Sequence, residues 1–310
     1  MISLSSIKPV IEIASGIIFI EPDKLENNQE LANYSAQMDT MTEIARSTFA
    51  SEDGGRPEDS KTKVGQYICF GMPGTGKNWM VKQSAWSLRD RYGIKASYLE
   101  ISCNTLIQIA KSVSVIRGYL ARATARVERR LPAIIVFDEL DALAVEKVQL
   151  GGIENRFALE VAALIKNRFN VHGVNGKLLF VGVTNYPGDI DGAVKTLLGS
   201  PLYLPLPTED CFVQMLSKKK FPQPEEVGKE FVHEYLLPNY MCPRSFARGC
   251  EEAKKQYGAT LARKTPKDIA ECIFSLSGLP YAPAEVDRYE EINEPYIRQS
   301  EGMTLHRKRP

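Results

Sequence analysis

The segment with the clearest chemical meaning reads Gly71-Met72-Pro73-Gly74-Thr75-Gly76-Lys77-Asn78. It matches the phosphate-binding pattern G-x-x-x-x-G-K-[ST] at every position but the last. The glycines of this pattern let backbone N–H groups surround the phosphates, and its lysine reaches the β and γ oxygens. Its final hydroxyl ligates Mg²⁺, and Asn78 stands there instead. The segment therefore predicts binding of a nucleoside triphosphate and leaves the rate of hydrolysis open.

The flanking segments argue against a chance glycine-rich turn. Residues 65–70 are β-branched and aromatic, as in a buried strand, and residues 79–88 carry apolar side chains at helical spacing. A strand, a glycine loop and a helix point the free N–H groups of the helix N-terminus at an anion. We therefore predict a nucleotide site that includes Gly71, Pro73, Gly74, Thr75, Gly76, Lys77, Asn78 and Trp79.

An apolar run ending in two carboxylates forms the second motif. Residues 133–137 are typical of a central parallel strand with both faces covered, and Asp138 and Glu139 follow at the end where open α/β sheets bind ligands. Asp138 is predicted to hold Mg²⁺ with Asn78, whose carbonyl oxygen can still reach a metal. Glu139 is predicted to activate the attacking water as a general base. A solvated acidic pair is the alternative, and the glycine loop upstream favours the catalytic interpretation.

A further strand over residues 178–185 ends in Thr184 and Asn185. Asn185 is expected to hold the attacking water near the γ-phosphate, and a helix or turn cap is the alternative. With another strand at residues 96–101, strands and helices alternate along the chain. This order predicts an α/β fold with a parallel sheet flanked by helices, as in P-loop NTPases.

Taken in order, these motifs resemble those of the AAA+ ATPases. Residues 137–143 look like that family's extended Walker B motif, and residues 183–185 look like its sensor 1. Residues 191–193 and 202–207 resemble the end of the large subdomain in the branch that includes katanin and spastin. The resemblance covers roughly residues 61–260. It implies ATP and Mg²⁺ as cofactors, and catalytic roles for Lys77, Glu139 and Asn185.

The resemblance also implies a division of the chain. Residues 1–60 are expected to be an N-terminal extension and linker, in which residues 10–20 form two strands or an interface segment and residues 27–48 form helices. The large nucleotide-binding subdomain then spans residues 61–207 and a small α-helical lid spans residues 208–275. Residues 276–310 contain several prolines and a basic end, and we expect a poorly ordered C-terminal tail that docks on a neighbour or partner.

One lid residue is a candidate for contact with the nucleotide. Pro243 at a helix start is followed by Arg244, which resembles the sensor-2 position of some AAA+ proteins. Arg244 would then reach the γ-phosphate and report nucleotide state through movement of the lid. A surface arginine in the first turn of a helix is the alternative.

The chain departs from the family pattern at two places. The segment after the sensor-1 strand has no arginine where the branch carries its fingers, and Lys195 lacks the planar fork of guanidinium. The pore-loop equivalent, residues 111–114, has no aromatic residue to grip a threaded chain. Downstream, residues 113–130 combine a helical apolar stripe with five arginines, which fits either a solvated face or contact with an acidic partner or nucleic acid.

Composition limits the other possibilities. The formal net charge is +1 over 310 residues, which gives no global field for nucleic acid or acidic membranes. No apolar run approaches the roughly 20 residues that span a bilayer. The six cysteines form no C-x-x-C pair, which fits a reduced cytoplasmic compartment.

Three functions remain open. The first is an AAA+ ATP-binding protein with weak ATPase activity, which assembles as a homo- or hetero-oligomeric ring or arc and remodels or regulates a protein partner. The second is a hydrolysis-impaired structural or regulatory subunit, favoured by Asn78 and the missing arginines. The third, a DNA-associated initiator or loader, rests on the arginine-rich stretch and Arg244.

Overall fold

The structure is a computed structural model that describes residues 11–12, 17–25, 35–49, 66–109, 114–115, 118, 132–143, 178–190, 195, 198–236, 240–278 and 280–305. Most of the arginine-rich stretch at 113–130, residues 111–113 of the pore-loop equivalent, and residues 191–194 and 196–197 lie outside these residues. So do the linker at 51–60 and the basic end after residue 305.

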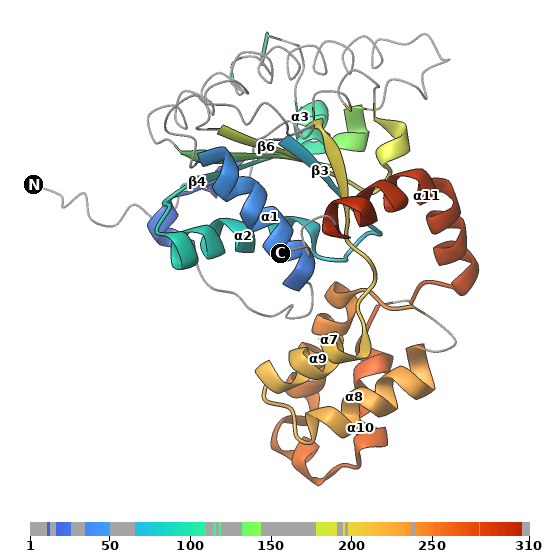
Figure 1. The fold of residues 1–310 in the computed structure, drawn as a ribbon. Helices are drawn as coiled ribbons and strands as arrows, with labels where there is room; N and C mark the ends of the chain where they lie inside the picture. Colours follow the sequence, from blue (N-terminus) through green and yellow to red (C-terminus); the bar gives the residue numbers. More distant parts are fainter. Residues whose placement is uncertain are drawn as a thin grey trace, which may run out of the picture.

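A seven-stranded sheet in the order β1-β2-β4-β5-β6-β3-β7 forms the centre of the α/β part (Figure 1). The strands from β3 to β7 are mutually parallel, which confirms the predicted parallel α/β sheet. The two N-terminal strands run antiparallel at the β4 edge, so residues 10–20 do form two strands. The bounds are β1 Ile11–Glu12, β2 Ile17–Ile20, β3 Gln66–Phe70, β4 Ser97–Ser102, β5 Ala133–Asp138, β6 Leu178–Thr184 and β7 Ser200–Tyr203.

Apolar residues cover both faces of this sheet, as its continuous apolar strands require. In β3, Tyr67 and Cys69 pack on the face covered by α1 (Ser35–Phe49) and α2 (Lys77–Tyr92). Ile68 and Phe70 point to the opposite face, toward α3 (Cys103–Ile109) and the 3₁₀ turn Leu140–Leu143. Because successive residues of a strand alternate between faces, one strand contributes to both cores.

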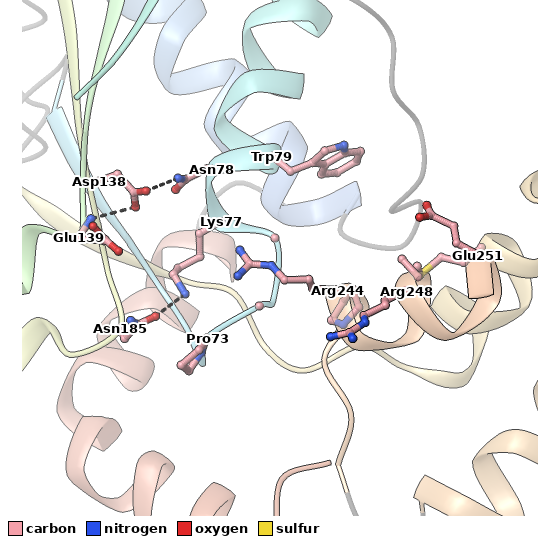
Figure 2. Close-up of a pocket in the computed structure, with 15 residues that line it drawn as sticks. Pro73, Lys77, Asn78, Trp79, Asp138, Glu139, Asn185, Arg244, Arg248 and Glu251 are labelled. Carbon is pink, nitrogen blue, oxygen red and sulfur yellow. Dashed lines mark hydrogen bonds between the residues drawn. The ribbon is translucent and has the colours of Figure 1, made fainter. Parts of the chain in front are cut away.

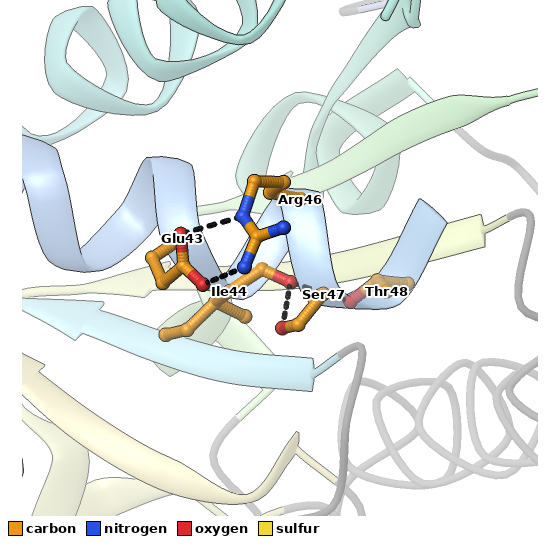
Figure 3. Close-up of polar contacts among 5 residues, drawn as sticks. All are labelled: Glu43, Ile44, Arg46, Ser47 and Thr48. Atoms are coloured by element: carbon orange, nitrogen blue, oxygen red, sulfur yellow. Dashed lines mark hydrogen bonds and ion pairs between the residues drawn. The ribbon is translucent and has the colours of Figure 1, made fainter. Parts of the chain in front are cut away.

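Helix α1 belongs to the same unit, although residues 1–60 were expected to be an extension and linker. It packs along α2. Side chains in its last turns hydrogen-bond to one another and to its backbone carbonyls (Figure 3). Arg46 donates to both carboxylate oxygens of Glu43, at 2.8 and 2.5 Å, and lies over the ring of Tyr92 on α2. The Thr48 hydroxyl donates a hydrogen bond of 2.7 Å to the Ile44 carbonyl. Helix α1 therefore packs as part of the α/β unit.

A cluster of helices follows the sheet and lies apart from it in Figure 1, as the lid prediction anticipated. Its centre is aromatic, with the Phe212 and Phe231 rings each 4.7 Å from that of Phe246 in edge-to-face contact. The last helix of the cluster begins with a capping box between Thr265 and Asp268. The elements are α7 Glu209–Lys218, α8 Pro224–Phe231, a π-helical turn Val232–Leu236, α9 Pro243–Tyr257, a 3₁₀ turn Gly258–Arg263 and α10 Pro266–Leu276.

The expectation of a poorly ordered C-terminal tail is wrong. Residues 283–305 form helix α11, which returns to the sheet and packs beside β7 (Figure 1). Pro283 starts the helix, where a missing N–H costs no hydrogen bond. Pro295 lies inside it, and a proline there permits a bend. The prolines misled the prediction, whereas the buried positions Val286, Tyr289, Asn293 and Ser300 follow helical spacing.

All six cysteines lie within the described residues, and each is a buried thiol outside any disulfide. Over the same residues, none of the helices combines the length and the apolar character that a bilayer crossing requires.

The contact between α9 and α10 generates a stability prediction. A β-carbon at Gly249 would lie 2.4 Å from the Ile273 carbonyl oxygen and 2.1 Å from the Ser277 Oγ atom. We expect Gly249→Ala to lower the free energy of unfolding by about 1–3 kcal/mol, because the backbone contact forces the helices apart. Urea unfolding measures this. Gly188→Ala is the control, since its β-carbon would meet only one ring carbon at 3.9 Å; equal losses in both variants would contradict the prediction.

Candidate functional site

The glycine loop between β3 and α2 has the backbone shape that only glycine adopts easily. Gly76 precedes α2 with φ of 95°, in the left-handed region. Gly74 has φ of 77°, and a β-carbon there would lie 2.5 Å from the Sγ atom of Cys242 in the lid. The glycines therefore let the loop turn and let the lid approach it closely. The free N–H groups at the start of α2 face the space that an anion can occupy.

The ammonium of Lys77 is held by three oxygen atoms. It donates to the carbonyls of Gly71 and Met72 at 2.8 and 2.9 Å, and to Oδ1 of Asn185 at 2.8 Å (Figure 2). Burial lowers the pKa of Lys77 to about 8, and the positive charge of Arg244 acts in the same direction. A phosphate brought to this ammonium would favour its charged form. Lys77 thus joins the loop to the end of β6.

Asn78, one residue further along α2, points its amide nitrogen at two carboxylates. Nδ2 donates to Oδ2 of Asp138 at 2.6 Å and to Oε1 of Glu100 at 3.3 Å. The other Asp138 oxygen accepts the Glu139 backbone N–H at 2.9 Å. By donor chemistry Asp138 suits Mg²⁺, which prefers carboxylate oxygen. The nitrogen of Asn78 does not suit it, so Asn78 can act as a ligand only after its amide turns to present Oδ1.

Glu139 adopts a backbone conformation that is unusual for its type. Its φ is 53°, in the left-handed region, and such outliers gather at functional sites. Ser102, at the end of the neighbouring strand β4, donates its hydroxyl to the Glu139 carboxylate at 3.0 Å. The cross-strand register pairs Ser102 with Asp138, which brings these polar ends together. The Glu139 carboxylate therefore has a defined position beside Asp138.

Asn185 follows β6, which lies between β5 and β3 in the sheet. This order places Asn185 next to both the carboxylate-bearing strand and the loop-bearing strand. Its side chain accepts from Lys77, and its backbone carbonyl accepts a hydrogen bond of 2.7 Å from the Tyr289 hydroxyl on α11. Burial raises the pKa of Tyr289, so the phenol keeps the proton that it donates.

A second tyrosine ties the C-terminal part of the chain to the loop. The hydroxyl of Tyr281 donates to the carbonyl of Pro73 at 2.6 Å. Its backbone exchanges two hydrogen bonds with Tyr240, at 2.9 and 2.6 Å, in the segment that leads to α9. Met72 of the loop packs against Val286 and Tyr289 on α11. The loop is thus held from the lid side and from α11.

These elements enclose a pocket of about 630 Å³, within the usual range for small-molecule sites. The lid closes one side, and Figure 2 shows Arg244 extending from α9 toward Lys77. Cations and carboxylates both face this space, as phosphate and metal binding require. Its lining consists of Pro73, Gly74, Gly76, Lys77, Asn78, Trp79, Asp138, Glu139, Asn185, Met215, Pro243, Arg244, Ala247, Arg248 and Glu251.

Most of the residues predicted from sequence therefore meet in one pocket. Gly71 and Thr75 do not line it: Gly71 offers its carbonyl to Lys77, and the buried Thr75 returns its hydroxyl to the Met72 carbonyl at 2.9 Å. Lys195, considered as a partial substitute for an arginine finger, is engaged within its own chain. Its ammonium donates to the Gly188 carbonyl at 2.7 Å and to the Tyr296 hydroxyl at 3.2 Å.

The sequence did not predict the contacts of Glu100, Ser102, Tyr281 and Tyr289 with the site, nor the lid residues Met215, Ala247, Arg248 and Glu251 that line the pocket. Glu100 and Ser102 could have been found, because polar side chains alternate there within an otherwise apolar strand. Tyr281 and Tyr289 gave no comparable signal, since an isolated tyrosine in a proline-containing segment does not reveal what its hydroxyl contacts.

Comparison with known proteins agrees with this geometry. The family model described as "ATPase family associated with various cellular activities (AAA)" matches residues 67–206. Residues 67–206 are an AAA ATPase domain. This AAA domain holds the glycine loop, both carboxylates and Asn185, and Arg244 lies beyond it in the lid.

Among curated relatives, the ATPase family AAA domain-containing protein FIGL1 of Arabidopsis thaliana is 31% identical over 49% of this chain and 22% of its own length. Human vacuolar protein sorting-associated protein 4A is 28% identical over 54% of this chain and 36% of its length. Zebrafish (Danio rerio) spastin is 32% identical over 48% and 25%. The matched region thus spans about a quarter to a third of these proteins.

The fold matches a solved AAA structure over nearly its whole length. The crystal structure of the FIGL-1 AAA domain gives a TM-score of 0.61 at 18% identity, covering 90% of this chain and 92% of that one. At this identity the likeness concerns the fold. It extends beyond the AAA domain to the helices that follow it.

The tyrosine on α11 generates a second prediction. We expect Tyr289→Phe to lower the free energy of unfolding by about 0.5–1.5 kcal/mol, because the Asn185 carbonyl loses a partly buried hydrogen bond. Tyr203→Phe is the matched control: its hydroxyl meets Glu290 at 3.5 Å, at the limit of hydrogen bonding and in an exposed position. Urea unfolding compares the two. A Tyr203→Phe loss as large as that of Tyr289→Phe would contradict the anchoring role of Tyr289.

Proposed function

We propose that this chain is an ATP-binding AAA protein with weak ATPase activity, which assembles with other subunits and remodels or regulates a protein partner. The observation that carries the proposal is the convergence of Lys77, Asp138, Glu139 and Asn185 on one pocket. A related AAA domain, that of FIGL-1, was crystallised with ADP. We extend adenine nucleotide binding from that domain to this one.

Each residue of the pocket has a role in this proposal. Lys77 and the N–H groups of residues 71–78 bind the phosphates, and Glu139 takes the proton of the attacking water as general base. Asn185 orients that water, and Arg244 contacts the γ-phosphate from the lid. Asp138 would hold Mg²⁺, joined by Asn78 once its amide has turned. When bound, Mg²⁺ neutralises charge on the phosphates.

Two features support slow hydrolysis. Asn78 replaces the hydroxyl that normally completes the metal site, and its amide is engaged with carboxylates. Lys195 is hydrogen-bonded to Gly188 and Tyr296 of its own chain. Loss of an arginine finger costs about three to five orders of magnitude in rate. A partner subunit that supplies arginine would restore part of this loss.

Lys195 also favours a second function, that of a hydrolysis-impaired regulatory subunit in a hetero-oligomer. In either function we propose a cytoplasmic location, which the buried thiols, none of them in a disulfide, support. A protein partner is proposed from the relatives, and neither function depends on nucleic acid.

Replacing the general base separates the two functions. We expect Glu139→Gln to bind ATP as the wild type does and to lower its multiple-turnover hydrolysis at least about 100-fold, because the amide cannot take a proton. Phosphate release measures turnover, and calorimetry measures binding. Lys77→Ala should lose binding and serves as the negative control. Equal turnover in wild type and Glu139→Gln would overturn the enzyme assignment and leave the regulatory one.

Assembly provides an independent measurement. We expect the Glu139→Gln variant to form a larger species with ATP than without it, because unhydrolysed nucleotide keeps subunit interfaces closed. Light scattering gives the mass in both conditions. An unchanged monomer mass would contradict self-assembly and point to a partner subunit.

A further inference from the structure

The amide of Asn78 lies between two carboxylates at the place where a P-loop protein offers a hydroxyl to its metal. Its nitrogen is 2.6 Å from Asp138 and 3.3 Å from Glu100. We infer that Asn78, Asp138 and Glu100 form an amide-bridged carboxylate pair that occupies the metal position while nucleotide binds, so that this chain binds adenine nucleotides with little dependence on Mg²⁺ and a metal enters only when the amide turns for hydrolysis. The inference rests on the proposed function and concerns a property that the family match does not specify.

A metal would compete with the hydrogen bonds that the Asn78 amide already makes. A primary amide has two N–H donors on nitrogen, and that nitrogen offers no lone pair to a metal. Both donors of Asn78 are used, one for each carboxylate. To ligate a metal beside Asp138, the amide must turn and give up both contacts. A hydroxyl both donates and accepts, so serine or threonine avoids this competition.

The Glu100 side chain is itself held in place. Its side chain is 13% exposed, and its Oε2 atom accepts from the Tyr98 hydroxyl at 2.9 Å. Lys82, one turn after Asn78 on α2, lies 3.8 Å from the same oxygen. Glu100 therefore presents Oε1 to Asn78 from a fixed position. We assign Glu100 as a positioning residue that fixes which way the amide faces.

Without metal, a nucleotide would meet charges that the protein itself partly compensates. Both oxygens of Asp138 accept hydrogen bonds, from Asn78 and from the Glu139 backbone. Lys82 lies beside Glu100, and Lys77, Arg244 and Arg248 line the pocket. The carboxylates of Asp138 and Glu100 are thus partly compensated by protein donors, and three cations remain for the phosphates. Removing Mg²⁺ should then change affinity little.

Calorimetry on the full chain tests this directly. ADP and a non-hydrolysable ATP analogue are titrated with Mg²⁺ and with EDTA, so that turnover does not enter. We expect the wild-type Kd to change less than about threefold between the two conditions. Asn78→Thr should bind at least about tenfold more tightly with Mg²⁺ than with EDTA, the range typical of a change at a metal site.

Matched variants test the part played by Glu100. Glu100→Ala frees one amide N–H and should increase Mg²⁺ dependence, whereas Glu100→Gln keeps an acceptor oxygen and should behave as the wild type does. Asp23→Asn removes an exposed carboxylate that pairs with Lys95 and should change nothing. Quenching of Trp79 fluorescence gives a second readout of binding, and urea unfolding confirms that each variant is folded.

Each outcome is decisive. A wild-type affinity independent of Mg²⁺ together with a dependent Asn78→Thr affinity supports the inference. If wild type and Asn78→Thr share the same dependence, whether strong or weak, the amide is not the cause and the inference is overturned while nucleotide binding stands. If the wild type binds neither nucleotide in either condition, the proposed function fails and the inference falls with it.

Discussion

The buried ammonium of Lys77 is the interaction on which the rest of the site depends. A charge removed from water is costly unless several oxygens surround it, and here two loop carbonyls and the Asn185 side chain do so. These oxygens come from segments more than a hundred residues apart. They meet only because β6 lies directly beside β3 in the sheet. The need to surround the Lys77 ammonium with oxygens therefore fixes the glycine loop and the end of β6 relative to each other.

The same constraint explains the C-terminal part of the chain. The loop and the β6 tip carry backbone carbonyls that need donors, and Tyr281 and Tyr289 supply them at Pro73 and Asn185. Met72 adds an apolar contact to α11. Tyr281 hydrogen-bonds both to Pro73 of the loop and to Tyr240 ahead of α9, so a movement of the lid would shift the loop. The helix that carries Arg244 is thus connected to the loop through the backbone as well as through the Arg244 side chain.

Asn78, in place of the usual serine or threonine, changes the chemistry of one position while the surrounding residues still meet in one pocket. The loop shape, the position of Asp138 and that of Lys77 are all kept, and only the chemistry at the metal position differs. An amide donor between two carboxylates satisfies them within the protein, where a hydroxyl would leave them available to a cation. Lys195 is likewise satisfied within its own chain. Both observations support the slow hydrolysis that we propose for this chain.

The sequence by itself determined the parallel sheet, the glycine loop and the two adjacent carboxylates, Asp138 and Glu139, at a strand end. Each depends on a local pattern: apolar strands, glycines at turns, and polar residues where strands end. It also placed Arg244 at a helix start, although only the fold brings that helix over the pocket. The direction of the Asn78 amide, the role of Glu100 and the return of α11 were decided by tertiary structure alone. Each depends on which side chain faces a given donor or acceptor across the fold. Prolines in residues 276–310 indicated disorder locally, yet buried contacts with β7 and the loop stabilise a helix there, since burial of an apolar face outweighs weak helix propensity.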